Sequence, residues 1–341
     1  MKNNFPFISV ITPMKNEVNY IEKCINSVLK QDYPHNKIEI LIVDGGSTDG
    51  STKVVQKLMK KNKNIKLLGG SGVNCPAGMN IGIKNAKGKL IAKIDSHGYI
   101  PPDFLQLAVK YFSYHKKNKV KCVGGPIKAI PKSLTAKSNV LARTSKFGVG
   151  GGIYSQKAKS DFTDTVQCGV YQKDIFLKIG LFDETLQFGE DEELNWRIIK
   201  AKYKIFYTSD INFYYYPRNT LKKLYLQYYN YGNARIKVLL KFPDFFKIKH
   251  MIPAVLVSSL IVSGVLAVFF MPFQYIFYLT LTSYIIASLI MSFIISIKNG
   301  LKYFLLLPFS FGALHFGYGF GLINGIIKNI REVYNKLTLP G

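Results

Sequence analysis

The sequence predicts an α/β domain with a mostly parallel sheet and helices on both of its faces, followed by a C-terminal α-helical membrane region. Over residues 1–218, short apolar or β-branched runs alternate with helical patterns across short connections, which is typical of such a sheet. Between Met251 and Ile327, Leu, Ile, Phe, Val and Ser dominate, and Lys298 and Lys302 are the only acidic or basic side chains besides His315. A segment this apolar indicates membrane helices.

Four apolar runs in the first domain predict strands, and the segments between them predict helices. The expected strands are Phe7–Thr12, Lys37–Val43, Ile65–Leu68 and Leu90–Ile94. The expected helices run from about Val18 to Leu29, from a cap at Ser47, Thr48 or Asp49 to about Lys60, from Pro76 to Ala86, and from Asp174 to Ile179. The glycine-containing stretch Lys132–Thr165 is expected to be a mobile lid or crossover.

Polar side chains follow two of the expected strands. The second strand is followed by Asp44, and the fourth by Asp95, Ser96 and His97. Because parallel strands gather their carboxyl ends at one edge of a sheet, these side chains are expected to lie near one another. An aspartate and a histidine two residues apart can bind one divalent cation where a strand gives way to a loop, although a solvated polar turn would have the same sequence.

Composition and charge argue against several classes of protein. The net charge is +26, but the lysines are spread along the chain, and the long apolar spans are not needed by a nucleic-acid binder. Basic residues crowd before and between these spans, which suits anionic lipid headgroups. The turn TPMKNE after the first strand has no glycine, which excludes a Rossmann dinucleotide site, and the chain has no Walker loop.

The cysteines and the N-terminus predict a cytosolic first domain. The four cysteines are far apart and form neither a disulfide framework nor a metal-ligand spacing, as expected in a reducing compartment. The first apolar run is too short for an export signal and is broken by Pro6 and Pro13.

Four motifs together resemble a known family. PFISVITPMKNE, EILIVDGGSTDGST, AKIDSHGYIPPDF and GLFDE…FGEDEELNWRI are similar, in order and spacing, to the inverting family 2 glycosyltransferases with the GT-A fold. The DSH motif, Gly45 in place of a second aspartate, and the ending QYYNYG further resemble the succinoglycan-type glucosyltransferases that act on lipid-linked sugars. The resemblance covers about residues 5–240.

The resemblance implies a donor site on the first loops. The loop from Pro13 to Glu17 and Asp44 would hold the nucleoside, and Asp95 would contact the ribose or a metal ion. His97 would stand where the last acid of the usual D-x-D motif binds the cation, Mg²⁺ or Mn²⁺.

The acidic run at Glu190 to Glu193 would supply the base. The resemblance implies that Asp191 is the general base and that Glu190 beside it contacts substrate. Four acids at the start of a helix also suit the positive end of its dipole, and this remains the alternative for Glu192 and Glu193.

Gln227 lies where the family carries its acceptor-binding Q-x-x-R-W motif. Asn230 and Tyr231 replace the Arg and Trp of that motif, so the resemblance is weaker here. Gln227 is retained as a candidate substrate contact.

The C-terminal region is expected to form a multi-pass membrane anchor. Residues 219–250, with the pattern Leu221–Phe246, predict an amphipathic helix at the cytosolic leaflet, with an ordinary solvated helix as the alternative. Within residues 251–341, Met251–Met271 and Phe273–Ile297 predict two spans, and Tyr303–Ile327 a third span or a re-entrant element. Residues 328–341 form a short basic tail.

These expectations lead to one function and two alternatives. The expected function is transfer of a hexose from a nucleotide-sugar, a UDP-sugar, to a lipid-linked saccharide in cell-surface polysaccharide or glycan assembly, on the cytoplasmic side of the cell membrane. A polyprenyl-phosphate glycosyl synthase is the alternative within the enzyme class. A catalytically inactive membrane scaffold with the same fold is the alternative from another class.

Overall fold

The computed structural model describes residues 5–149, 160–243 and 248–331. The chain divides into two compact units, one made of residues 1–130 and 156–216 and the other of residues 131–155 and 217–341. The sequence predicts one uninterrupted first domain to residue 218, whereas the structure groups residues 131–155 with the C-terminal helices.

The first unit is built on an eight-stranded sheet in the order β3-β2-β1-β4-β9-β6-β10-β8. Its strands are β1 Ile8–Met14, β2 Ile38–Asp44, β3 Ile65–Gly69, β4 Leu90–Lys93, β6 Val120–Gly124, β8 Asp161–Thr163, β9 Val170–Gln172 and β10 Lys204–Tyr207. Strands β1 to β4 are mutually parallel, and β9 runs antiparallel between β4 and β6. A second, three-stranded sheet contains β5 Gly98–Tyr99, β11 Phe213–Tyr215 and β7 Ile127–Ala129.

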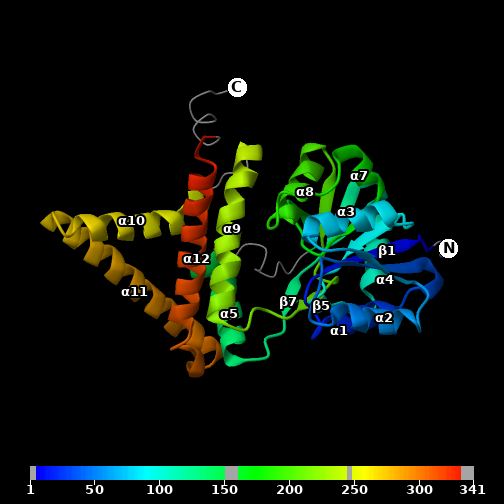
Figure 1. Ribbon diagram of the computed structural model, residues 1–341, viewed down its shortest axis with the longest axis horizontal. Coiled ribbons are helices and arrows are strands. Elements are labelled where there is room, and N and C mark those ends of the chain that lie inside the picture. The colour runs from blue at the N-terminus through cyan, green and yellow to red at the C-terminus, as the bar shows by residue number, and fades with distance from the viewer. Residues whose placement is uncertain (1–4, 150–159, 244–247, 332–341) are drawn as a thin grey trace. The chain divides into compact units, whose positions relative to one another are not determined.

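Helices cover both faces of the large sheet, as Figure 1 shows. One face carries α1 Ile21–Leu29, α2 Ser51–Met59 and α4 Phe104–Tyr114, and the other carries α3 Cys75–Asn85, α7 Asp174–Ile179 and α8 Glu190–Lys200. Successive strand residues alternate between two hydrophobic cores: Leu90 and Ala92 join the first and Ile91 joins the second. The predicted α/β fold class is therefore confirmed.

The second unit is helical. Its helices are α5 Leu134–Thr144, α6 Lys146–Val149, α9 Leu221–Lys241, α10 Ile252–Leu266, α11 Met271–Asn299 and α12 Leu307–Lys328. The stretch Lys132–Thr165, expected to be a mobile lid or crossover, contains α5 and α6, and Ser133 caps α5 by accepting a hydrogen bond from the Ala136 amide. Gly150, Gly151 and Gly152 lie outside the described residues.

Helices α9 and α12 pack along each other at backbone contact distance (Figure 1). On α12, Gly317, Gly321 and Gly325 face backbone carbonyls of α9, and a Cβ at Gly321 would lie only 2.0 Å from the Tyr229 oxygen. Five of the six buried residues of α9 recur every four positions: Leu224, Tyr228, Gly232, Ile236 and Leu240. Because α12 covers this stripe, the amphipathic pattern of residues 219–250 has a partner within the same unit.

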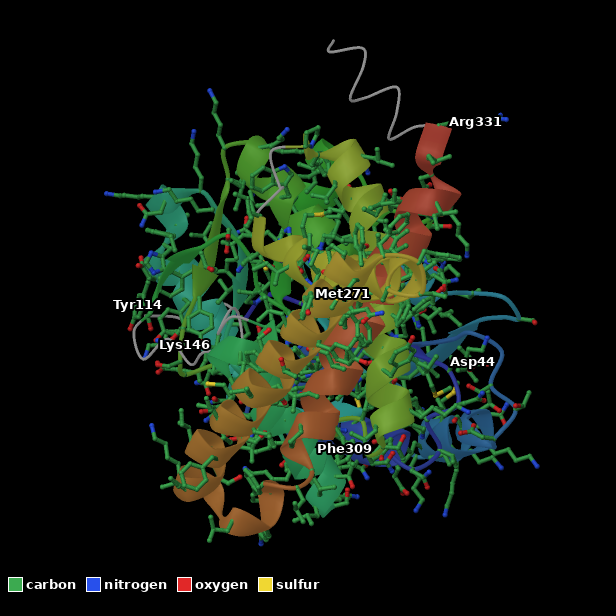
Figure 2. The ribbon with its side chains drawn as sticks, turned by 90° about the vertical axis from the view of Figure 1, so that its left-hand side faces the viewer. Asp44, Tyr114, Lys146, Met271, Phe309 and Arg331 are labelled. Atoms are coloured by element: carbon green, nitrogen blue, oxygen red, sulfur yellow. The ribbon has the colours of Figure 1, made fainter. Side chains whose placement is uncertain are left out.

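One helix in the described part of the chain is long and apolar enough to cross a membrane, judged by length and composition alone. This is α11, which begins at Met271 (Figure 2), has 29 residues and leaves most of its apolar side chains uncovered. The sequence predicts two or three spans, the first of them over Met251–Met271. Helix α10 in this region ends at Leu266 and has only 15 residues, which is short for a membrane span. Most of the basic tail lies outside the described residues.

Candidate active site

Asp44 lies at the carboxyl end of β2 and organises the loop that follows. Its carboxylate accepts hydrogen bonds from the amides of Gly46 and Ser47 at 3.1–3.2 Å and from the Ser47 hydroxyl at 2.6 Å. Only 9% of the residue is exposed. These bonds fix the loop at the rim of the sheet.

The loop after β1 is tied to this loop by side-chain hydrogen bonds. The Asn16 amide donates to the Ser47 hydroxyl at 2.9 Å, and the Val18 amide donates to the Asp49 carboxylate at 3.0 Å. Helix α2 begins at Ser51, whose backbone amide donates to the Asp49 carboxylate at 3.0 Å, so of the three expected capping residues Asp49 contacts the helix start and Ser47 serves the loop. The loops that carry Pro13, Glu17 and Asp44 are therefore tied together at the rim.

Gly45 explains one departure from the family pattern. A Cβ at this position would lie 2.4 Å from the Val73 carbonyl oxygen. A second aspartate would therefore require the neighbouring backbone to move, so the glycine follows from a close backbone approach.

Asp95 and His97 follow β4, the strand beside β1. His97 Nδ1 lies 3.7 Å from Glu17 Oε1, which brings the predicted cation ligand next to the predicted nucleotide loop. Asp95 Oδ1 lies 3.6 Å from Lys93 Nζ. Burial alone would raise the pKa of Asp95, but the charges of Lys93 and His97 outweigh it and hold that pKa below its usual value.

The acidic run forms the first turn of α8. Gly189 precedes the helix in the left-handed conformation with φ 81°, and all four acids from Glu190 to Glu193 stand at the positive end of the helix dipole. Glu190 and Asp191 turn toward the sheet, where both contact Lys93.

Lys93 joins the two halves of the site. Its Nζ lies 2.6 Å from Asp191 Oδ2, 3.4 Å from Glu190 Oε1 and 3.6 Å from Asp95 Oδ1, and only 2% of its side chain is exposed. Burial would lower the pKa of Lys93, but the three carboxylates raise it well above its ordinary value. The loop after β4 and the start of α8 are nearly a hundred residues apart in sequence. They therefore meet at the ammonium group of Lys93.

Burial raises the pKa of the first two carboxyl groups of α8. Burial raises the pKa of Glu190 to about 7, and the charge of Asp191 adds to this effect while Lys93 opposes it. Burial also raises the pKa of Asp191. Asp191 Oδ2 is bound by Lys93, but its Oδ1 is buried and has no hydrogen-bond partner among the described residues.

Glu193 has a structural role. Its side chain is fully buried and accepts two hydrogen bonds from Arg197 Nε and one from Arg197 Nη2. Arg197 in turn donates to backbone carbonyls of the turn after α7, including that of Leu181 at 2.7 Å. Of the two acids left open by the sequence, Glu193 therefore supports the neighbouring turn.

Asp95 and His97 carry side chains of the kinds that bind divalent cations. Within the ranges that the structure describes, no group of three or more His, Cys, Asp or Glu side chains is arranged to hold a metal ion by itself. Asp95 and His97 would supply two ligands, and Mg²⁺ is commonly held by one or two carboxylates together with substrate phosphates.

Gln227 belongs to a different unit from the other candidates. It lies on α9, where its side-chain amide donates to the Tyr231 hydroxyl at 3.0 Å. Tyr231 thus contacts Gln227 in the region where it replaces the family's Trp.

Lys93 is not among the site residues predicted from the sequence. Its position inside an apolar strand is nevertheless unusual for a lysine. The run Leu90–Ile94 is otherwise apolar on both faces of the strand. A lysine in such a strand cannot reach water and must find acidic partners. Which acids those are depends on how α8 packs against the sheet, and the sequence pattern does not contain this information.

A family model described as Glycosyl transferase family 2 matches residues 9–180. This range runs from β1 to just past α7 and includes the rim, Lys93, Asp95 and His97. Asp191 lies beyond it.

Two curated relatives match most of the chain. It is 31% identical over 330 residues to the dolichyl N-acetyl-alpha-D-glucosaminyl phosphate 3-beta-D-2,3-diacetamido-2,3-dideoxy-beta-D-glucuronosyltransferase of Methanococcus voltae, covering 94% of this chain and 98% of the relative. It is 28% identical over 246 residues to the succinoglycan biosynthesis protein ExoA of Rhizobium meliloti (strain 1021), covering 72% of this chain and 73% of the relative.

A solved structure shares the fold. The mannosyltransferase PcManGT from Pyrobaculum calidifontis, in complex with GDP-Man and Mn²⁺, has a TM-score of 0.58 and 18% sequence identity, covering 96% of this chain and 88% of that one. This similarity shows the predicted GT-A-like α/β fold.

Proposed function

Because the chain belongs to glycosyl transferase family 2, we propose that it transfers a hexose from a UDP-sugar to a lipid-linked saccharide in cell-surface polysaccharide or glycan assembly. The observation that carries this proposal is the meeting of Asp95 and Asp191 at the buried Lys93. This contact places Asp95, a candidate metal ligand at the donor site, close to Asp191, the candidate general base. The names of the two relatives, one acting on a dolichyl phosphate-linked sugar and one in succinoglycan biosynthesis, support the class of acceptor.

The donor would bind at the rim formed by the loops after β1 and β2. Pro13, Glu17 and Asp44 would contact the nucleoside, and Asp95 and His97 would hold Mg²⁺ or Mn²⁺. The presence of Mn²⁺ in the PcManGT complex supports the choice of cation. When bound, such a cation stabilises the negative charge that develops on the departing diphosphate.

Asp191 would act as the general base of an inverting transfer. Its free Oδ1 would accept the proton of the acceptor hydroxyl, while Glu190 would lie against the substrate. A raised carboxyl pKa suits this role, because a base is most effective when its pKa lies near the working pH. Inversion requires the acceptor to attack from the sugar face opposite the leaving group.

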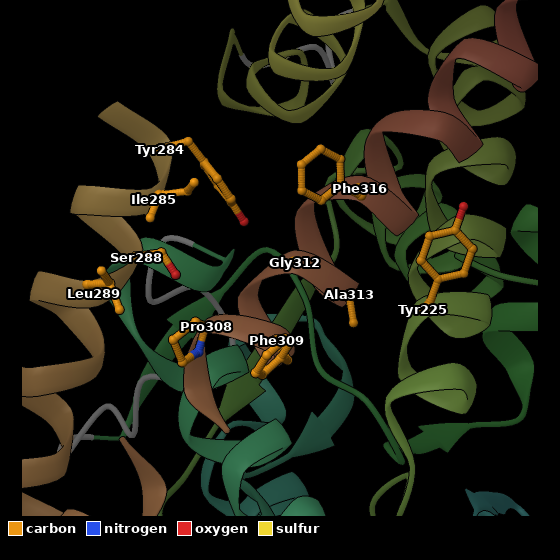
Figure 3. Close-up of a pocket in the computed structure, with 10 residues that line it drawn as sticks. All are labelled: Tyr225, Tyr284, Ile285, Ser288, Leu289, Pro308, Phe309, Gly312, Ala313 and Phe316. Carbon is orange, nitrogen blue, oxygen red and sulfur yellow. The ribbon is translucent and has the colours of Figure 1, made fainter. Parts of the chain in front are cut away.

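The second unit would anchor the protein and hold the lipid. Helix α11 would lie in the membrane, with the first unit on the cytoplasmic side and the basic residues near anionic headgroups. A pocket of about 450 Å³ lies between α9, α11 and α12 (Figure 3). Its lining is almost wholly apolar and includes Tyr225, Tyr284, Phe309 and Phe316, which suits the hydrocarbon chain of an acceptor lipid.

The test is a transfer assay on the full-length protein in lipid nanodiscs with Mn²⁺. Radiolabelled UDP-hexoses are offered with three acceptors: a long-chain lipid-linked saccharide, its short-chain soluble analogue and bare polyprenyl phosphate. We expect label on the long-chain saccharide, less on the short-chain analogue, and none with Asp191→Asn, which should still bind UDP and Mn²⁺.

Two outcomes would overturn the proposal. Label on polyprenyl phosphate alone would identify a polyprenyl-phosphate glycosyl synthase. Binding of UDP and Mn²⁺ without turnover of any nucleotide-sugar and lipid-extract combination would identify an inactive scaffold.

A further inference from the structure

We propose that Lys93 is a positioning residue, which holds the base Asp191 in place relative to the cation ligand Asp95. The inference rests on the proposed function, since it assigns a role within the same site. Lys93 lies on β4 and acts through the three carboxylates that it contacts, those of Asp95, Glu190 and Asp191.

The position of Lys93 on β4 points its side chain toward the start of α8. Alternate residues of β4 face opposite sides of the sheet, and Ile91 packs in the core shared with α3, α7 and α8. Lys93, two residues later, faces the same side, and its backbone amide is held by the Gly169 carbonyl at 3.0 Å. The lysine is therefore fixed to the central part of the sheet.

The charges explain why an ammonium group is needed at this place. Asp95, Glu190 and Asp191 are three carboxylates within 3.6 Å of Lys93 Nζ, and the lysine side chain is only 2% exposed. An apolar side chain would leave three neighbouring acids without a counter-charge, which is costly in a buried site. One ammonium offers three hydrogens, so it can direct one toward each acid.

The contacts divide the two oxygens of Asp191 between two tasks. Lys93 takes Oδ2 at 2.6 Å, the shortest of its three acid contacts, and Oδ1 remains buried without a partner among the described residues. Because Lys93 holds Oδ2, the Asp191 carboxylate cannot rotate freely. The orientation of Oδ1 is therefore fixed. A base fixed in this way is ready for an acceptor hydroxyl, and a misplacement of about 1 Å can cost about 100-fold in rate.

The experiment compares Lys93→Met with a matched control in the transfer assay. Lys121→Met removes another lysine of the same sheet, whose Nζ lies 2.6 Å from Asp174 Oδ2 on the neighbouring α7. We expect K93M to lower kcat by about 100-fold and to leave the donor KM near its wild-type value. K121M should keep the wild-type kcat, and Lys93→Arg should recover part of the activity because it restores a cation.

A double variant tests whether Lys93 works through Asp191. If it does, K93M in the Asp191→Glu background, which keeps a carboxylate and part of the activity, causes a smaller loss than K93M alone, because residues that act as a unit are not additive. A further loss equal to that of K93M alone would overturn the inference, as would a raised donor KM with unchanged kcat. Absence of transfer by the wild-type protein would instead refute the proposed function.

A third pair of variants keeps the test decisive if K93M fails to fold. Lys93→Met combined with Glu190→Gln removes one positive and one negative charge, so the buried charge stays as balanced as in the wild type. Its kcat is compared with that of Glu190→Gln alone. A loss of about 100-fold supports the inference, and equal rates overturn it.

Discussion

Glu190 and Asp191 show how one buried lysine can set the chemistry of two neighbouring acids. Both carboxyl groups lose water on folding, which raises their pKa, and both are partly compensated by the same ammonium group. Lys93 approaches Asp191 more closely than Glu190, at 2.6 Å against 3.4 Å. Because both acids contact the same ammonium group, they titrate as a pair, and the first proton that they take up belongs to the pair.

Transfer is expected to lose activity as the pH falls through about 7. The pKa of Glu190 is raised, so protons bind to the pair at a pH where ordinary carboxyl groups are ionised, and a protonated base cannot accept another proton. Glu190→Gln removes a neighbouring negative charge, so the acidic limb should move to lower pH. A profile of kcat/KM against pH for both proteins checks this, and an unshifted limb would contradict the assignment.

Residue types at the rim were predictable, whereas the partners of each residue were not. The positions of Asp44, Asp95 and His97 after strands follow from the apolar runs that precede them. The role of Lys93 is not predictable from the sequence, because this lysine lies inside an apolar run and its role depends on an acid nearly a hundred residues away.

At the scale of elements, α8 is secured by the buried ion pair between Glu193 and Arg197. Glu193 and Arg197 are one helical turn apart, and the guanidinium also binds carbonyls in the turn after α7. This arrangement fixes the direction in which α8 leaves that turn, and so the place of Asp191.

Glu193→Gln is expected to lower the free energy of unfolding by about 3 kcal/mol, because it leaves a partly buried guanidinium without its carboxylate. Glu22→Gln, an exposed acid in the first turn of α1, is the control and should change stability little. Denaturant unfolding of the full-length protein in detergent measures both. Equal stability of E193Q and wild type would rule out this role.

The glycines of α12 lead to a second prediction for the elements. Gly321→Ala places a methyl group 2.0 Å from the Tyr229 carbonyl oxygen, so α9 and α12 must separate, at a cost of about 1–3 kcal/mol. Gly312→Ala on the same helix meets nothing closer than Phe316 Cδ2 at 3.9 Å and should be neutral or stabilising. Thermal unfolding should show a lower Tm for G321A only; similar values for both variants would contradict the close packing.

For the whole molecule, the proposed membrane attachment would combine an apolar helix with a high positive charge. The net charge of +26 favours attraction to anionic lipid, but salt screens this attraction. Burial of α11 in lipid is not screened in this way. Membrane attachment through α11 is therefore expected to survive a wash with 1 M salt, which shortens the Debye length to about 3 Å.

Leu279→Arg tests this attachment. Leu279 lies within α11 and is 71% exposed, and a charge in the middle of a membrane helix costs about 3 kcal/mol. The variant should shift protein from the salt-washed membrane pellet to the soluble or aggregated fraction. Lys302→Gln, outside the helix, serves as the control, and an unchanged distribution for L279R would mean that α11 does not span the membrane.

The sequence by itself determined the fold class, the family, the strands that carry Asp44 and Asp95, and the helix that begins at Glu190. These features follow from local patterns, because a strand or a helix start depends on residues close together in the chain. Only the tertiary structure decided that residues 134–149 pack with the C-terminal helices, that α12 covers the apolar stripe of α9, and that Lys93 binds Asp95 and Asp191 together. These contacts depend on packing and on charge pairing between segments that are far apart in the chain. Neither the packing nor the pairing produces a periodic pattern in the sequence.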